Sequence, residues 1–412
     1  MDALATVGRL DMVYLLHSLG AKPTTMALDH AAALPILQFL FDKYDLRCTA
    51  QAIDWAAENG RLDIVKYLHN TRTEGCSTKA MDMAAANGYL EVVEYLHNTR
   101  TEGCTKFAID VAARNGHLDI VRYLMDYRTE GCTTDAMDLA AHNGHMSIVE
   151  LLHRSGKAGC TTDAIDRASL VGHTSIVEFL HYNRTEGCTG IAMNKAASQG
   201  HLSVVQFLND NRSEGCSTQA MDWAAANGDL EMVEYLHHNR TEGCTTDAMD
   251  SAASLGHLHI VQFLDQHRTE GCTTDAMIRA AQYNHLSILR YLHEHRTEGC
   301  MTMAMDIAAE QGHLPIVQFL HINRTEGCTL AAMDKAAAMG HLDVVKFLHI
   351  NRTEGCSTRA VDRAASNGHL PVVQFLLQNR TEGGTRYALM NADRNQHGEV
   401  VQYLHQNGDG VK

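Results

Sequence analysis

Basic residues are in short supply in this sequence of 412 residues. Lysine and arginine together number 34, against 49 aspartates and glutamates, and the formal net charge at pH 7 is -15. Nucleic-acid backbones and anionic membrane surfaces are bound through cationic surfaces, which this balance does not supply. We therefore expect no nucleic acid and no membrane as the main partner, and favour the basic or neutral surface of another protein.

Long apolar runs are also missing. Asp2, Arg9 and Asp11 interrupt the start of the chain, which leaves no apolar segment of signal-peptide type there. Nothing elsewhere approaches the ~20 consecutive apolar residues of a membrane span. The sequence also lacks a glycine-rich phosphate loop, a nucleophile elbow and a His-Glu-x-x-His zinc motif. We expect an intracellular, cytoplasmic protein without enzymatic activity and without a cofactor.

What the sequence does contain is a strict period. Its 12 cysteines follow one another at intervals of 28 residues. A fixed period of this length is typical of a repeat protein, in which each repeat buries its apolar face by stacking on its neighbours. Function is then expected on a repeated surface and not in a single pocket. The cysteines are Cys48, Cys76, Cys104, Cys132, Cys160, Cys188, Cys216, Cys244, Cys272, Cys300, Cys328 and Cys356.

Each repeat predicts two helices. With the cysteine as position zero, position one is Thr or Ser in eleven of twelve repeats, Met301 being the exception. A hydroxyl at position one is typical of the N-cap of a first helix. The later Asn-Gly pair is typical of the left-handed backbone conformation that ends a helix. A second helix follows with an apolar stripe, as in residues 118–124. Pro35, Pro315 and Pro371 fall in the first turn of second helices, where proline removes no helical hydrogen bond.

The same register continues at both ends of the chain. Residues 1–22 form a truncated first unit, 23–47 a short unit, 48–383 the twelve 28-residue repeats, and 384–412 a C-terminal capping unit. In the last of these, Asp393 and Gly398 replace small or apolar residues, which suits an end without a further neighbour. We therefore expect residues 1–412 to form a single repeat domain of about fifteen helix pairs.

The text Ala-Ala-x-Asn-Gly-His-Leu-x-Ile-Val-x-Tyr-Leu, as at residues 112–124, resembles the ankyrin repeat, and the resemblance covers essentially the whole chain. It departs at the helix start, which reads Asp247-Ala248-Met249-Asp250 where the family has Thr-Pro-Leu-His, and in a shorter repeat that lacks part of the inter-repeat finger. The resemblance implies an all-α, ankyrin-like helical solenoid with shortened loops. It also implies a non-catalytic protein-binding module that uses the exposed face of its first helices.

The many cysteines and histidines raise the question of a metal-binding or redox function. Equivalent positions in successive repeats lie about 10 Å apart, which is too far for a disulfide or a shared zinc ion. Twenty of the 26 histidines stand in two columns, after the turn glycine and at the end of the second helix. We expect them to form structural hydrogen bonds and no metal site. For the cysteines a small buried filler is favoured, and a reactive thiol near a helix N-terminus is the alternative.

Aspartate recurs at position six, as in Asp54, Asp82 and Asp250. Acid–base catalysis needs two groups on one substrate, whereas these residues are spread along the repeats. We predict a structural role, as inter-repeat ion pairs with the loop arginines Arg72, Arg100, Arg184, Arg240 or Arg324.

Position seven differs from repeat to repeat while its surroundings recur. Positions three, seven and ten share one side of the first helix, away from the apolar positions five, eight and nine. Position seven is mostly apolar up to residue 139 and largely basic from residue 167, so a ligand with an apolar segment followed by an acidic one would match it. The residues are Trp55, Met83, Val111, Leu139, Arg167, Lys195, Trp223, Ser251, Arg279, Ile307, Lys335 and Arg363.

We call positions three, seven and ten the stripe, and take all position-seven residues except Ser251 as candidate binding residues. Trp and Arg are common interface anchors. Random drift at solvated positions is the alternative explanation. The prediction is a protein–protein interaction scaffold or adaptor that is a monomer. The alternative function is a passive structural rod, or a fragment of a larger protein whose effector domain is missing.

Two places break the repeat pattern. Residues 154–159 replace the usual loop text, and Ser169, Val171 and Thr174 replace usual core residues in the next repeat. Ile278, Tyr283 and Asn284 do so later. In a linear stack, such repeats are expected to open first.

Overall fold

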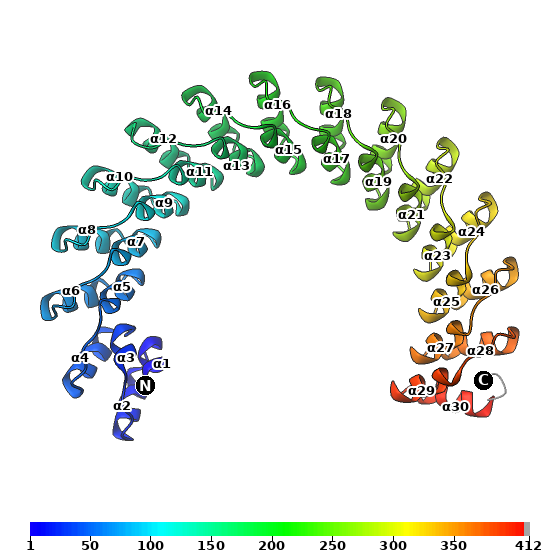
Figure 1. Ribbon diagram of the computed structural model, residues 1–412, viewed down its shortest axis with the longest axis horizontal. Helices are drawn as coiled ribbons and strands as arrows, with labels where there is room; N and C mark the ends of the chain where they lie inside the picture. The colour runs from blue at the N-terminus through cyan, green and yellow to red at the C-terminus, as the bar shows by residue number, and fades with distance from the viewer. Residues whose placement is uncertain (408–412) are drawn as a thin grey trace. The chain divides into compact units, whose positions relative to one another are not determined.

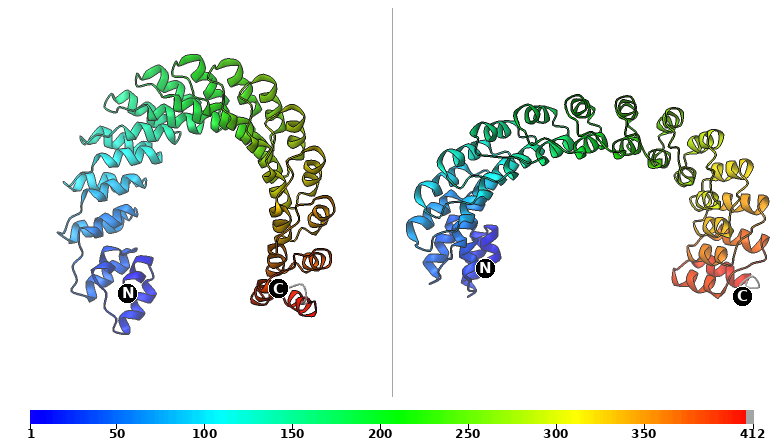
Figure 2. Two further views of the ribbon diagram at one scale, coloured as in Figure 1. Left: turned by 45° about the vertical axis from the view of Figure 1, so that its right-hand side comes forward. Right: turned by 45° about the horizontal axis from the view of Figure 1, so that its top comes forward.

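The computed structural model describes residues 1–407. These residues form thirty α-helices and no strand, which confirms the all-α fold of about fifteen helix pairs. They group into two compact units, Met1–Gly215 and Cys216–Lys412, which we call the N-terminal and the C-terminal unit. Within each unit the first helices of successive pairs lie side by side in one row, and the second helices lie in another (Figures 1 and 2).

The N-terminal unit holds eight pairs, from blue to green in Figure 1. Its first helices are α1 (Asp2–Val7), α3 (Thr25–Asp29), α5 (Gln51–Glu58), α7 (Thr78–Ala86), α9 (Lys106–Asn115), α11 (Asp135–His142), α13 (Asp163–Val171) and α15 (Gly190–Ser198). Its second helices are α2 (Leu10–Ser18), α4 (Leu34–Lys43), α6 (Leu62–Thr71), α8 (Leu90–Thr99), α10 (Leu118–Tyr127), α12 (Met146–Ser155), α14 (Thr174–Asn183) and α16 (Leu202–Asn211).

The C-terminal unit holds seven pairs among the described residues, from green to red. Its first helices are α17 (Gln219–Ala226), α19 (Thr246–Leu255), α21 (Thr274–Gln282), α23 (Thr302–Glu310), α25 (Leu330–Ala338), α27 (Arg359–Ser366) and α29 (Arg386–Arg394). Its second helices are α18 (Leu230–Asn239), α20 (Leu258–His267), α22 (Leu286–His295), α24 (Leu314–Asn323), α26 (Leu342–Asn351), α28 (Leu370–Asn379) and α30 (Gly398–Gln406).

First helices begin at the predicted hydroxyl. In all eleven repeats with Thr or Ser at position one, its oxygen accepts the amide two residues on, as Thr245 Oγ1 does from Asp247 at 3.1 Å. This bond satisfies an amide that the first helical turn leaves without a partner. Met301 offers no such oxygen, and α23 begins without a side-chain cap.

The turn between the two helices requires glycine. Gly116 has a φ of 86°, and His117 N donates to Ala112 O at 2.9 Å, which closes the end of α9. A Cβ on Gly116 would lie 2.7 Å from Cε1 of His145 in the next repeat. The Nε2 of His145 in turn lies 3.1 Å from the carbonyl oxygen of Arg114. The histidine after the turn therefore has the structural role expected of it, covering the preceding turn.

The recurring aspartates bind the helix start of the next repeat, so the predicted pairing with loop arginines is wrong. Asp250 accepts the backbone N–H of Thr273 at 2.9 Å and its hydroxyl at 2.6 Å. We call this pair of bonds the aspartate clamp. The stacking places the next helix start directly against the carboxylate, whereas the arginines are held elsewhere. The clamp recurs at Asp54, Asp82, Asp110, Asp138, Asp166, Asp222, Asp306, Asp334 and Asp362.

The loop arginines pair with a glutamate two residues later in their own loops. Arg100 pairs with Glu102, and Glu102 Oε1 also accepts the amide of Cys76 in the adjacent loop at 3.2 Å. This links successive loops to one another. Arg72 differs, because its guanidinium lies 3.7 Å above the ring of Phe41. The same arginine–glutamate pairing holds Arg184, Arg240 and Arg324.

Alanines at positions eight and nine, the residue at position five and the aliphatic residues of the second helix fill the interior. Ser169 takes the place of one of these alanines, is 0% exposed, and its hydroxyl has no hydrogen-bond partner. In the helix pair α29 and α30, Asp393 and Gly398 are exposed. Residues 408–412 of the predicted capping unit lie outside the described residues.

Candidate functional site

The predicted stripe lies on the side of the first helices that faces away from the buried interior. Its position-seven residues are half-buried or exposed, whereas positions five, eight and nine of the same helices are buried. Arg167, Arg279 and Arg363 are the exposed ones. Each residue has its counterparts on the neighbouring first helices of the same unit, because those helices pack directly against one another. Within each unit, the structure therefore brings the position-seven residues into one continuous row.

Ion pairs reduce the positive charge of this row. Arg167 bonds to Asp163 at 2.8 Å, one helical turn away, and Arg279 lies 3.7 Å from Asp275 in the same arrangement. Lys335 reaches Glu310 of the preceding first helix at 2.6 Å. In contrast, Arg363 forms no ion pair with any described residue. The basic half of the stripe is thus less attractive to an acidic ligand than its sequence indicated.

A hollow of about 460 Å³ lies beside Trp55 in the N-terminal unit. Gln51, Trp55 and Glu58 of α5 line it, with Ser77 and Lys79 from the start of the next repeat. The Trp55 ring meets His30 of the preceding repeat edge to face, at 5.9 Å between centroids. This contact fixes the indole at the wall of the hollow.

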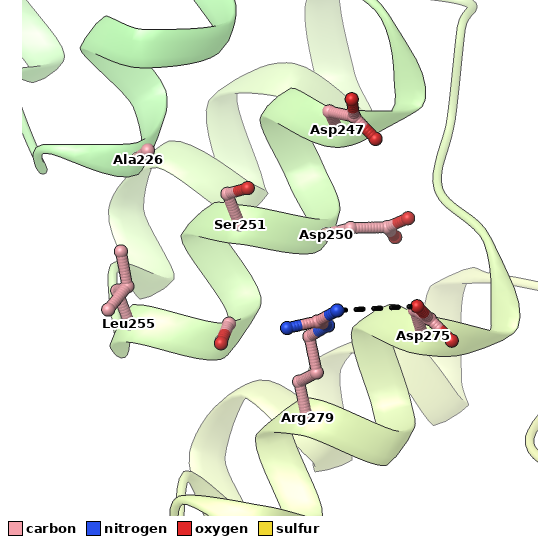
Figure 3. A pocket seen from close by; sticks show the side chains of 8 residues that line it. Ala226, Asp247, Asp250, Ser251, Leu255, Asp275 and Arg279 are labelled. Carbon is pink, nitrogen blue, oxygen red and sulfur yellow. Dashed lines mark ion pairs between the residues drawn. The ribbon is translucent and has the colours of Figure 1, made fainter.

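A second hollow, of about 290 Å³, lies beside Ser251 in the C-terminal unit (Figure 3). Here the small serine side chain of α19 leaves open space where other repeats carry a large residue. Asp247 and Asp250 of α19 and Asp275 and Arg279 of α21 surround it. Both hollows therefore open on the stripe.

Exposed apolar side chains also gather on the first helices and their ends. Sequence reasoning named none of them as binding residues, because it concentrated on position seven. They could have been found as apolar residues at positions one to three and eleven, where the repeat text is otherwise polar. In the N-terminal unit they include Phe107, Val171 and Ile191, and in the C-terminal unit Leu255, Tyr283, Met301, Met303, Leu330 and Met339.

Most of the cysteine thiols are buried. Burial is the main cause that raises the pKa of the Cys104 and Cys244 thiols to about 12, and Glu130 and Glu270 respectively add to it. For Cys300 the same causes give about 11. All twelve thiols are free. A thiol with such a pKa stays protonated at neutral pH and is a poor nucleophile, which agrees with the filler interpretation.

No group of three or more His, Cys, Asp or Glu side chains in residues 1–407 lies close enough together to hold a metal ion. Over the same part of the chain, every helix is too short or too polar to cross a membrane.

The fold defines a helix-pair repeat protein whose first helices carry a row of variable residues. Family models for ankyrin repeats match residues 81–166, 164–250 and 221–303 in one case, and 53–97, 305–349, 333–377 and 361–405 in another. The chain belongs to the ankyrin-repeat family. Ankyrin repeats are generally protein–protein interaction modules, and proteins built from them are typically non-enzymatic scaffolds. No curated protein sequence matches the chain significantly.

Proposed function

We propose that this chain is a protein-binding scaffold or adaptor that acts as a cytoplasmic monomer and holds its partner on the stripe. The observation that carries the proposal is that both hollows open at position-seven residues. The binding residues proposed are Trp55, Met83, Val111, Leu139, Arg167, Lys195, Trp223, Arg279, Ile307, Lys335 and Arg363.

The chemistry of the surface supports a protein as the ligand. The aspartate clamp and the loop pairs recur with the repeat, whereas position seven ranges from Trp to Ser, Lys and Arg. Exposed apolar side chains beside it offer the area that protein interfaces bury. The net charge of -15 favours a basic or neutral partner over nucleic acid. An acidic segment that meets α27 would find unpaired guanidinium groups at Arg359 and Arg363.

The test is a proximity-crosslinking pull-down from the source cell. It compares the wild type with a variant that carries Trp55→Ala, Trp223→Ala, Arg279→Ala and Arg363→Ala. We expect the variant to lose the partners that the wild type captures, because large aromatic and arginine side chains supply most of the binding energy at such interfaces.

The control also replaces four residues, here on the second helices: Tyr182→Ala, Ile322→Ala, Ile350→Ala and Arg122→Ala. These side chains are exposed. Both variants are checked for wild-type helicity by circular dichroism. If the control loses the partners and the stripe variant keeps them, binding takes place on the second helices. If the wild type captures no partner, the proposal is wrong and a passive rod is favoured.

A further inference from the structure

The hollow beside Ser251 carries a surplus of negative charge. Asp247, Asp250 and Asp275 contribute three carboxylates, against the single guanidinium of Arg279. The carboxylate of Asp247 forms no hydrogen bond or ion pair with any described residue. Asp250 accepts two bonds from Thr273, and Asp275 lies 3.7 Å from Arg279. An occupant that carries positive charge would therefore meet an unpaired carboxylate at the rim.

The wall of the hollow holds a polar group without a partner. Ser254 lines it and is 8% exposed, and its hydroxyl takes part in no hydrogen bond with a described residue. The serines at the same position in two other repeats are satisfied. Ser198 Oγ donates to Lys195 O at 2.8 Å, and Ser366 Oγ accepts from Asn395 at 3.2 Å. Because Ser254 lines the hollow, its hydroxyl can pair with a polar group of an occupant.

The three carboxylates also act on one another. Burial is the largest cause that raises the pKa of Asp250, and the charges of Asp275 and Asp247 raise it further, against the hydrogen bonds from Thr273. A cation between the carboxylates would relieve this repulsion, so the electrostatics of the hollow favour the same kind of occupant as its geometry. The cation is not a metal ion, since no described group of three acidic, His or Cys side chains is arranged to hold one.

We propose that the hollow beside Ser251 binds a lysine or arginine side chain of a partner protein. This inference rests on the proposed function and specifies the partner's chemistry at one point of the stripe. The volume of about 290 Å³ is at the lower end of the range for small-molecule sites, which suits one long side chain. Leu255 and Tyr283 at the neighbouring helix ends are 57% and 51% exposed, so an apolar residue should flank the basic one.

The proposal is tested with random peptides displayed on phage and selected on the full-length wild-type protein. We expect selected peptides to carry Lys or Arg beside an apolar residue. Replacing that residue with norleucine or citrulline in a synthetic peptide should weaken binding about tenfold, because a charge-assisted hydrogen bond is lost.

Variants of the protein locate the site. Ser251→Arg fills the hollow with a cation at a position where α21 and α27 carry arginine, so it should fold and should weaken the peptide about tenfold or more. Asp247→Asn should weaken it by less. The control Ile322→Arg places the same charge on the exposed surface of the second helix α24, outside the stripe, and should leave affinity for the peptide unchanged.

Peptides rich in Asp or Glu, or equal affinity for wild type and Ser251→Arg, would overturn the inference. Peptides that depend on Trp223 or Arg363 but not on Ser251 would reject this pocket and leave the proposed function intact. If no selected peptide depends on any first-helix residue, both the inference and the proposed function are contradicted.

Discussion

At one junction between repeats, both side chains of the aspartate clamp are replaced together by apolar residues. Asp306 accepts the amide of Thr329 at 2.8 Å and its hydroxyl at 2.6 Å. One repeat earlier, position six is Ile278 and the facing position one is Met301. Because both partners are apolar there, no carboxylate is left buried without its donors. This natural exchange indicates that the clamp acts as a unit.

A double-mutant cycle tests the clamp. Asp306→Ala leaves the amide and hydroxyl of Thr329 without an acceptor, so we expect a loss of about 1–3 kcal/mol in the free energy of unfolding. Thr329→Val should lower the free energy of unfolding by less in the Asp306→Ala background than in the wild type. The difference between the two losses, which is the coupling energy, should be about 1–2 kcal/mol. Urea denaturation followed by circular dichroism measures each step.

The reverse exchange is the control. Ile278→Asp alone should destabilise the protein, and adding Met301→Thr should recover part of the loss. Additive effects in both cycles would show that the two positions do not interact.

The buried cysteines should be unreactive in the folded protein. Burial raises the pKa of Cys272 and Cys328 to about 12, so at pH 8 thiolate is scarce. We expect iodoacetamide to label these residues slowly in buffer and rapidly in urea, as measured by peptide mass spectrometry. Rapid labelling of the folded protein at either residue would restore the alternative of a redox-sensitive thiol.

At the scale of a single repeat, the stretch 154–177 lacks two of the stabilising features found elsewhere. Its loop has Gly156 and Ala158 where other loops have the arginine and glutamate that link neighbouring loops. Ser169 then buries a hydroxyl without a partner in α13. Both defects lower the free energy needed to open this repeat locally.

Hydrogen exchange tests this weakness. We expect amides of α12 and α13 to exchange faster than those of α25 and α26, which have the complete loop pairing and Ala337 in place of the serine. Ser169→Ala should slow exchange in α13 and stabilise the protein by about 1 kcal/mol, because an unsatisfied hydroxyl is removed. Uniform protection, or no change on substitution, would contradict the prediction.

The sequence predicts helix pairs, caps and turn glycines correctly. These features depend on contacts within one repeat, and the residues that form them recur in many repeats. The partner of the aspartate was wrong, since Arg and Thr are both plausible donors and only the stacking geometry selects Thr273 for Asp250. The hollows were not foreseen. Ser251 is the one position-seven residue left out of the candidate binding residues, yet its small side chain leaves the open space. The ion pair between Asp275 and Arg279 could have been predicted from the sequence, because side chains four residues apart on a helix are neighbours.

For the molecule as a whole, acid should reduce stability through the loop glutamates. The hydrogen bond from Arg352 is the main cause that lowers the pKa of Glu354 to about 2, and Arg100 does the same for Glu102. A carboxyl with a lower pKa in the folded state adds stability above its ordinary value of 4.5 and loses it as the pH falls towards about 2. We therefore expect a falling melting temperature over this window.

The buried aspartates act in the opposite direction. Burial raises the pKa of Asp82 and Asp110, against the bonds from Thr105 and Thr133, so these carboxyls take up protons more readily when folded. Their contribution favours the folded state in acid and disappears as the pH rises through their folded pKa. Because the pKa of Glu354 is lowered to about 2, we expect protonation of the loop glutamates to govern the loss of stability below pH 4.5.

Glu354→Gln separates the two effects. This substitution removes the charge of one loop glutamate, so we expect a lower melting temperature than that of the wild type at pH 7. The difference in melting temperature between the two proteins should become smaller as the pH approaches about 2, because Glu354 of the wild type is itself becoming protonated there. The control Glu91→Gln changes an exposed glutamate of α8 that has no ion pair, and should leave the curve unchanged. If the gap between Glu354→Gln and wild type is the same at every pH, the loop glutamates are not the groups whose protonation unfolds the repeats in acid.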